Sequence, residues 1–252
     1  MRVDNSVLNV LGNAKMDGNA LVLQGTLDRA LYVATNKVLE AAGGKWDKKA
    51  KAHVFPVDAA DAMEQIIQTG EVTLIRTIQQ DFGYFPTPAP VVKRLLAMAD
   101  TDAGMRVLEP SAGRGAIAFA LAAQGATVDC YELLEANYTV IGADKRLNWV
   151  RHADFLQQAP EAIYDRVVMN PPFAKQADIK HVLHALKFLK PDGLLVSVMS
   201  ASVGFRDNKM TQDFRDLVRA CGGSIEDLPE GSFKESGTGV RTVIVTIPGE
   251  CA

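Results

Sequence analysis

The sequence predicts an α/β protein whose main domain is a parallel sheet with helices on both faces, preceded by a small α+β domain. From residue 91 onward, short apolar segments alternate with segments of helical periodicity, as strands and helices do around a parallel sheet. The chain of 252 residues is also long enough for one large domain and a small appendage. A ligand of such a sheet should lie at the carboxyl ends of the strands, where the strand order reverses.

The first domain is expected to span residues 1–80 and to mix strands with helices. Glycine pairs, N-capping aspartates and hydrophobic spacing define its elements. In order, they are a strand at 20–25, a helix at 27–42 that stops at the glycine pair 43–44, a hairpin that turns near 47–48, and a helix from the N-cap Asp58 to Gly70.

The second domain is expected to span residues 81–252, because glycine and prolines in the stretch QQDFGYFPTPAP interrupt the periodic pattern. Apolar runs of four to six residues predict its strands, and the longer periodic segments predict its helices. The predicted strands are Met105–Glu109, Thr127–Tyr131, Asn148–Val150, Asp165–Met169, Leu194–Met199 and Thr242–Ile247, and the predicted helices include Ala116–Gln124 and Ile179–Lys190.

The composition is that of an ordinary globular protein, with 48% hydrophobic and 23% charged residues. The net charge of -3 provides no global basic field. Any nucleic-acid contact must therefore come from a local patch and depend on salt. No apolar run reaches the roughly 18 residues that span a bilayer, and the first residues show no signal peptide, so we expect a cytoplasmic protein without a membrane partner.

The cysteines and histidines predict neither a disulfide nor a metal site. Cys130, Cys221 and Cys251 are far apart and form no CxxC pattern, which favours a reducing compartment. His181 and His184 form the only close histidine pair, and on a helix such a pair more often fills surface and core positions than binds a metal.

The stretch RVLEPSAGRGAIAFAL predicts a strand, a tight glycine turn and a helix. Gly113 and Gly115 would let the backbone approach a ligand, although a loop with two glycines can also simply turn. The dinucleotide pattern GxGxxG is not met, and Glu109 at the strand end would suit a cationic ligand better than a diphosphate. Glu132 ends the next strand, at a spacing that suits ribose hydroxyls. Asp154 with Phe155 follows the third strand and suits an adenine ring.

The segment Asn170-Pro171-Pro172-Phe173 ends a predicted strand with an amide, two prolines and an aromatic ring. Two consecutive prolines stop the strand and stiffen the backbone that follows. The Asn170 side chain and the proline carbonyls could therefore form a fixed socket for a flat group that carries an amine. A loop that merely terminates the strand is the alternative.

Five segments in order, YFPTPAPVV, VLEPSAGRGAI, YE, ADF and NPPF, resemble the gamma-class amino-group DNA methyltransferases over roughly residues 82–252. The resemblance implies a class I methyltransferase (Rossmann-like) fold with seven strands, the last antiparallel, and a closing hairpin from the segment 231–247. It also implies S-adenosylmethionine as cofactor, S-adenosylhomocysteine as product, and no metal. The implied cofactor-binding residues are Phe85, Pro86, Thr87, Pro88, Glu109, Pro110, Ser111, Ala112, Gly113, Gly115, Glu132, Asp154, Phe155 and Asn170.

By the same resemblance, the catalytic residues are Asn170, Pro171, Pro172 and Phe173. The Asn170 side-chain oxygen and the Pro171 carbonyl would accept the two N–H groups of the adenine N6 amine. They would also stabilise the positive charge that grows on its nitrogen. Phe173 would stack on a target base turned out of the duplex. No general base or metal is required.

The chain leaves no room after its last predicted strand for the large recognition domain that many members of this family carry. DNA contacts, duplex or single-stranded, are therefore expected to come from within the chain or from a partner protein. One candidate is a hairpin cluster that suits phosphates and stacked bases, although the same residues fit a plain hairpin with Trp46 in the core. Two rim loops supply the rest. The candidates are Lys45, Trp46, Lys48, Lys49, Lys51, Lys175, Arg206 and Lys209.

Methylation of adenine N6 in DNA is the leading interpretation, and other acceptors stay open. Asn-Pro-Pro-aromatic segments also occur in RNA guanine-N2 and in protein glutamine-N5 methyltransferases, and RNA adenine is a further acceptor. Thr87-Pro88 favours the DNA class, and Ala174 stands where the guanine enzymes frequently have histidine. A non-catalytic nucleic-acid-binding protein with the same fold is a weaker alternative. A nicotinamide-dependent oxidoreductase is weaker still.

Overall fold

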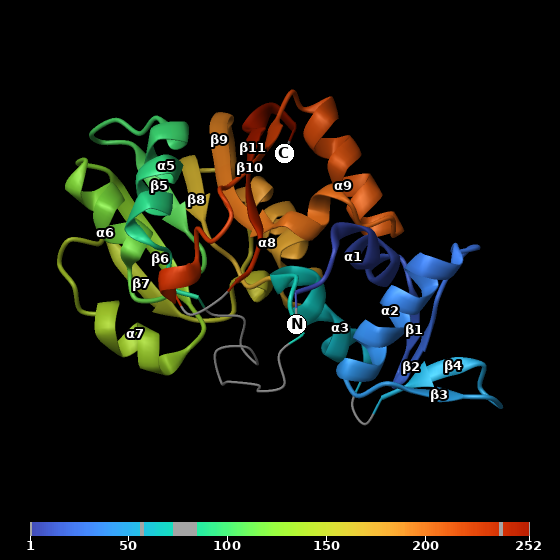
Figure 1. Cartoon of the computed structure of the whole chain (residues 1–252). Coiled ribbons are helices and arrows are strands. Elements are labelled where there is room, and N and C mark those ends of the chain that lie inside the picture. Colours follow the sequence, from blue (N-terminus) through green and yellow to red (C-terminus); the bar gives the residue numbers. More distant parts are fainter. Residues whose placement is uncertain (1, 56–57, 73–84, 237–238, 252) are drawn as a thin grey trace.

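The structure is a computed structural model, which describes residues 2–55, 58–72, 85–236 and 239–251. It contains a seven-stranded sheet and a smaller four-stranded sheet formed by the N-terminal part of the chain (Figure 1). The α/β class and the seven-stranded sheet predicted from the sequence are confirmed. The predicted boundary between residues 80 and 81 lies outside the described residues.

The large sheet has the strand order β10-β11-β9-β8-β5-β6-β7. β5 to β9 are parallel, and β11 is antiparallel to both of its neighbours. The order reverses beside β5, which pairs with β6 on one side and β8 on the other. The strands are β5 Arg106–Glu109, β6 Thr127–Glu132, β7 Trp149–His152, β8 Tyr164–Met169, β9 Leu189–Ser200, β10 Ser224–Asp227 and β11 Thr242–Pro248.

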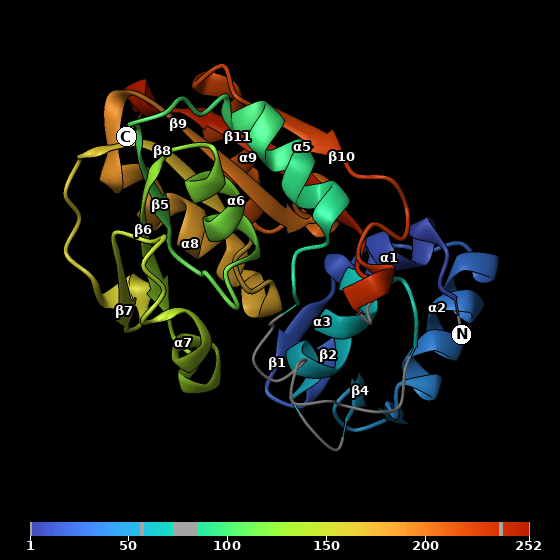
Figure 2. The ribbon, with the colours of Figure 1, turned by 90° about the vertical axis from the view of Figure 1, so that its left-hand side faces the viewer.

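Helices cover both faces of this sheet (Figures 1 and 2). Successive strand residues point to opposite faces, so Val107 packs in the apolar cluster with α5 and α6, and Leu108 packs in the cluster with α8 and α9. Both residues are fully buried, which explains why the central strands read as continuous apolar runs. The helices are α5 Ala89–Ala99, α6 Ala116–Ala123, α7 Glu135–Ile141, α8 Ala177–Ala185 and α9 Lys209–Ala220.

The N-terminal unit, residues 2–72, packs three helices on an antiparallel sheet of order β1-β2-β4-β3. Its core includes Leu11, Leu21, Leu39 and Met63, all fully buried. Its elements are α1 Asn5–Gly12, β1 Lys15–Asp17, β2 Ala20–Val22, α2 Arg29–Ala41, β3 Lys45–Asp47, β4 Ala52–Val54 and α3 Ala59–Thr69.

Local sequence signals fix the ends of α3 as predicted. The Asp58 carboxylate accepts a hydrogen bond from the Ala60 N–H at 2.9 Å, and Gly70 ends the helix with φ +68°. The predicted hairpin is also confirmed, since β3 and β4 pair across a turn that starts after Asp47. These elements were predictable because each depends on a few neighbouring residues.

Three expectations are wrong. The helix predicted up to Lys190 ends as α8 at Ala185, and β9 already begins at Leu189. The closing hairpin does not lie within 231–247, because the partner of β11 is β10, which precedes this segment. β10 has only four residues, none fully buried, and so gives a weak pattern. Finally, Cys221 is disulfide-bonded, whereas Cys130 is free and buried.

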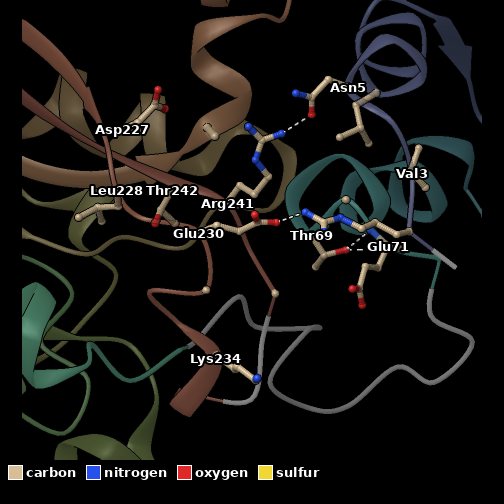
Figure 3. Close-up of a pocket in the computed structure, with 16 residues that line it drawn as sticks. Val3, Asn5, Thr69, Glu71, Asp227, Leu228, Glu230, Lys234, Arg241 and Thr242 are labelled. Atoms are coloured by element: carbon tan, nitrogen blue, oxygen red, sulfur yellow. Dashed lines mark hydrogen bonds and ion pairs between the residues drawn. The ribbon is translucent and has the colours of Figure 1, made fainter.

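The N-terminal unit contacts the large sheet through α3 and the loop that follows β9. Glu64 of α3 pairs with Arg206 at 2.6 Å, and both side chains are nearly inaccessible to solvent. Phe205 packs against the core of the N-terminal unit. A cleft of about 660 Å³ lies beside this contact (Figure 3). Arg2 reaches Glu230 across it. No helix among the described residues has the length and apolar character to cross a membrane.

Candidate active site

A cavity of about 250 Å³ lies at the carboxyl ends of four neighbouring strands, β8, β5, β6 and β7. The residues directly after these strands form most of its wall, which is where a parallel sheet is expected to bind a ligand. The predicted site residues in this wall are Phe85, Pro110, Ser111, Glu132, Asp154, Phe155, Asn170 and Pro172. Pro86, Thr87, Pro88, Glu109, Ala112, Gly113, Gly115, Pro171 and Phe173 were predicted as site residues but do not line this cavity.

The glycine loop between β5 and α6 requires both of its glycines. Gly113 has φ +56° and Gly115 has φ +84°, a region that side chains rarely adopt. A Cβ atom on Gly115 would also lie 2.6 Å from the Phe119 ring. The Gly113 N–H donates to Glu132 Oε2 at 2.6 Å. The loop is therefore folded against the carboxyl end of β6.

Backbone groups hold the two acidic residues of the wall. Glu132 Oε1 accepts from the Leu134 N–H at 2.7 Å, and Asp154 Oδ1 accepts from the Leu156 N–H at 3.0 Å. Each carboxylate oxygen has two lone pairs. These bonds therefore orient the carboxylates and leave acceptor capacity for hydroxyl or amino groups of a ligand.

Glu109 lies outside the cavity wall and is almost fully buried. Its Oε2 atom has no hydrogen-bond partner among the described residues. Burial raises the pKa of Glu109 well above its usual value, and the charge of Glu132 raises it further. Burial therefore disfavours the charged form of Glu109 in this conformation.

The orientation of the Asn170 amide is set by the segment before α5. Its Nδ2 atom donates to Thr87 Oγ1 at 3.0 Å and to the Phe85 carbonyl at 3.3 Å. The Oδ1 atom is buried and has no hydrogen-bond partner among the described residues. A buried amide oxygen without a partner is costly unless a ligand supplies a donor. Asn170, which lines the cavity, therefore has a buried acceptor that none of the described residues uses.

Phe173 is not placed to stack on a base. Its side chain is 2% exposed and belongs to the same apolar cluster as Phe233 and Val240. The predicted stacking role is therefore wrong for this conformation. The aromatic residue serves as an anchor that ties the Asn-Pro-Pro segment to the core.

The hairpin β3–β4 presents its lysines to solvent. The alternative interpretation, a plain hairpin with Trp46 in the core, is wrong, because the Trp46 side chain is 51% exposed. Its ring lies edge-on to His53, with ring centroids 5.1 Å apart. Asp47 Oδ1 accepts from the backbone of Lys49 and Ala50, which fixes the turn. The exposed lysines of the hairpin are Lys45, Lys48, Lys49 and Lys51.

Three other candidates for nucleic-acid contact are already paired. Arg206 is buried against Glu64, so its predicted role on the substrate surface is wrong. Lys175 contacts Asp61 at 3.0 Å. Lys209 contacts Asp213 at 3.0 Å and stays largely exposed.

Sequence reasoning missed part of the wall. His181 lines the cavity, although the sequence suggested only a packing role. Its Nδ1 atom donates to the Ala177 carbonyl at 2.7 Å, and burial lowers its pKa, which favours a neutral ring with Nε2 as an acceptor. The other missed residues lie within two positions of predicted ones in the chain, and that proximity was the available signal. They are Leu133, Leu134, Ala153 and Leu156.

The family model of the methyltransferase small domain matches residues 92–223, which is more than half of the chain. The match spans the glycine loop, the acidic strand ends and the Asn-Pro-Pro segment. A search of curated proteins finds no match.

Solved structures share the fold at low sequence identity. The type I restriction-modification methyltransferase subunit from Streptococcus thermophilus matches with a TM-score of 0.56 and 20% identity, over 75% of this chain and 48% of its own. This chain thus spans about half the length of that subunit. A protein from Listeria monocytogenes described as a class I S-adenosylmethionine-dependent methyltransferase matches with a TM-score of 0.53 and 15% identity, over 75% of this chain and 67% of its own. A dimethyladenosine transferase from Plasmodium falciparum matches with a TM-score of 0.51 and 16% identity, over 66% of this chain and 63% of its own.

Proposed function

The chain belongs to the methyltransferase small-domain family, and we propose that it transfers a methyl group from S-adenosylmethionine to the N6 amino group of adenine in DNA. The observation that carries this proposal is the buried, unpartnered Oδ1 of Asn170. Thr87 and the Phe85 carbonyl occupy the amide nitrogen, so only the oxygen is available. An oxygen fixed in this way favours a substrate whose methylated group carries an N–H hydrogen-bond donor.

Asn170 and the Pro171 carbonyl together would bind both hydrogens of a planar amine. The lone pair of an aromatic amine is delocalised into its ring, which makes the nitrogen a poor nucleophile. Two oriented acceptors favour the geometry in which this lone pair points out of the ring plane. They also stabilise the positive charge that develops on the nitrogen as its new bond forms. The two prolines keep the acceptors in place, so little alignment is lost before reaction.

The residues around the cavity fit S-adenosylmethionine. The spare acceptor capacity of Glu132 suits ribose hydroxyls, and that of Asp154 suits an adenine amino group. Neutral His181 offers one more acceptor in the wall. When bound, the cofactor supplies an electrophilic methyl group and leaves as S-adenosylhomocysteine. In this proposal Thr87 helps to orient the Asn170 amide, in addition to any contact with the cofactor.

The β3–β4 hairpin is the proposed contact to the DNA strand outside the cavity. Its four exposed lysines can bind phosphates, and the half-exposed Trp46 ring can stack on an unpaired base. With a net charge of -3 on the whole chain, this local patch has to provide the attraction. A cytoplasmic location, where DNA is accessible, belongs to the same proposal.

The methylated substrate can be identified with a labelled cofactor, without knowledge of the nucleotide sequence that the protein recognises. The protein is incubated with methyl-labelled S-adenosylmethionine and with separate pools of duplex DNA, single-stranded DNA, RNA and protein. The labelled pool is then digested to nucleosides or amino acids. We expect label in N6-methyldeoxyadenosine. Label in RNA adenosine or guanosine, or in protein glutamine, would replace the DNA acceptor by one of the three alternatives.

The role of Asn170 is tested by Asn170→Ala, with Asn9→Ala on the exposed face of α1 as a matched control. We expect Asn170→Ala to abolish transfer while the affinity for S-adenosylmethionine, measured by calorimetry, changes little. The control should retain both properties. An equal loss of binding and transfer in Asn170→Ala would show that the residue binds the cofactor and does not act on the acceptor amine.

A further inference from the structure

The loop that directly follows the Asn-Pro-Pro-Phe segment has an unfavourable backbone. Lys175 has φ +54° and Gln176 has φ +57°, and neither residue is glycine. The left-handed region costs roughly 1–2 kcal/mol for a residue with a Cβ atom, and here two such residues are consecutive. Strain of this kind persists only where the surroundings impose it, and it gathers at functional sites. The exit loop, residues 174–176, must therefore be held by its neighbours.

Two separate contacts hold the exit loop. Lys175 Nζ pairs with Asp61 Oδ1 on α3 of the N-terminal unit at 3.0 Å. Gln176 Nε2 donates to Thr211 Oγ1 at 2.7 Å, and its Oε1 accepts from Asn208 Nδ2 at 3.1 Å, both at the start of α9. One side of the loop is thus fixed by the large sheet's own helix and the other by the N-terminal unit.

The helix that carries Asp61 is itself fixed to the carboxyl edge of the large sheet. Glu64 lies three residues further along α3, on the same face, and forms the buried ion pair with Arg206. The loop after β9 is in turn joined to α8, because Asp178 at the start of α8 accepts a hydrogen bond from the Ser200 N–H at the end of β9 at 3.0 Å. α3 is therefore joined to the loop after β9 by Glu64 and to the exit loop by Asp61.

We propose that α3 of the N-terminal unit positions the catalytic segment, with Asp61 and Glu64 as positioning residues. Through Lys175, Asp61 keeps the exit loop in its strained conformation, and the loop holds the end of the Asn-Pro-Pro-Phe segment and thereby the position of its backbone, including the Pro171 carbonyl. This inference rests on the proposed role of Asn170 in transfer. It gives the N-terminal unit a part in the reaction itself, because small displacements of reacting groups lower rates strongly.

The test compares Asp61→Asn with the charge exchange Asp61→Lys/Lys175→Asp. Asp213→Asn is the matched control, because it removes another exposed lysine–aspartate pair of the same length. An exposed pair contributes up to about 1 kcal/mol, so we expect kcat to fall about two- to fivefold in Asp61→Asn. The KM for the cofactor should not change, and the melting temperature should fall by no more than about 2–4 °C. The charge exchange should restore kcat, and the control should leave it unaltered.

A second measurement does not depend on activity. Hydrogen exchange of the amides at 173–178, followed by mass spectrometry, should accelerate in Asp61→Asn and return in the charge exchange. Lys175→Gly should lower kcat without lowering the melting temperature, because glycine relieves the strain while the ion pair is lost. Faster exchange in a protein that methylates none of the four pools would reject the proposed function and retain the positioning role. Unchanged exchange and unchanged kcat in Asp61→Asn would overturn the positioning role alone.

Discussion

Replacing Glu64 by alanine should strongly destabilise the contact between the N-terminal unit and the large sheet. The Glu64 and Arg206 side chains are only 11% and 7% exposed, so solvent cannot take over the role of the lost partner. Removing one partner of a buried pair costs about 3–5 kcal/mol, because the other charge stays buried without compensation. The hydrogen bond from Gln68 Nε2 to Glu64 Oε1 is lost as well. The expected loss lies in the upper half of that range.

Urea unfolding and calorimetry measure this loss. For a chain of this size, 1 kcal/mol shifts the melting temperature by about 2–4 °C, so Glu64→Ala should melt roughly 8–20 °C lower. The double variant Glu64→Leu/Arg206→Met serves as control, because it removes both charges and keeps the volume. It should lose much less stability than Glu64→Ala, since well-packed apolar residues often replace a buried ion pair without cost.

A loss below about 1 kcal/mol for Glu64→Ala would refute this reasoning. It would mean that Arg206 reaches water or a second carboxylate once Glu64 is gone, and hence that the contact between the two units opens easily. A double variant as unstable as the single one would likewise show that shape, and not uncompensated charge, determines the cost. Either result would also weaken the case for α3 as a fixed support of the exit loop.

Three further changes follow from the geometry of the site. Thr87→Val should lower kcat about tenfold with cofactor affinity retained, because Asn170 loses the bond that orients its amide, whereas Thr87→Ser should keep activity. Gly115→Ala should weaken cofactor binding in calorimetry, because its Cβ would meet the Phe119 ring at a positive φ. Burial raises the pKa of Asp178 to about 7, above its usual 3.8. Between these pH values the folded state binds more protons than the unfolded state. The free energy of unfolding should therefore fall as the pH rises from about 4 to 7, by up to about 1.4 kcal/mol per unit, and this slope should disappear in Asp178→Asn.

The sheet could be predicted from sequence where burial acts on both faces of a strand. β5, β6 and β8 each contribute apolar residues to two different cores, which gave these strands their recognisable pattern. β10 could not be predicted, because a short edge strand with half-exposed residues leaves no such pattern. A long loop separates β10 from β11 in the chain, and no pattern of neighbouring residues shows that the two strands pair.

The partners of surface and interface residues could not be predicted, for a different reason. Arg206 and Lys175 looked like free cations beside a substrate, and both are paired with carboxylates of α3. Arg206 and Glu64 lie 142 positions apart in the chain, so the complementarity appears only once two units are packed together. For Trp46 the sequence left both a surface and a core position open, since hydrophobicity alone does not say which end of a small sheet remains open to solvent.

That several candidate residues lie around one cavity was predictable, because residues that follow neighbouring parallel strands meet at one edge of the sheet. The orientation of those residues was not. Whether Asn170 presents a donor or an acceptor depends on the Phe85 carbonyl, which lies 85 positions away and can only accept, whereas the Thr87 hydroxyl could pair with either end of the amide. The two choices select opposite chemical partners. An acceptor oxygen favours an amine, whereas a donor nitrogen would favour a carbonyl or a ring nitrogen. In the proposed reaction, the Phe85 carbonyl therefore decides which atom of the Asn170 amide is left to bind the amine.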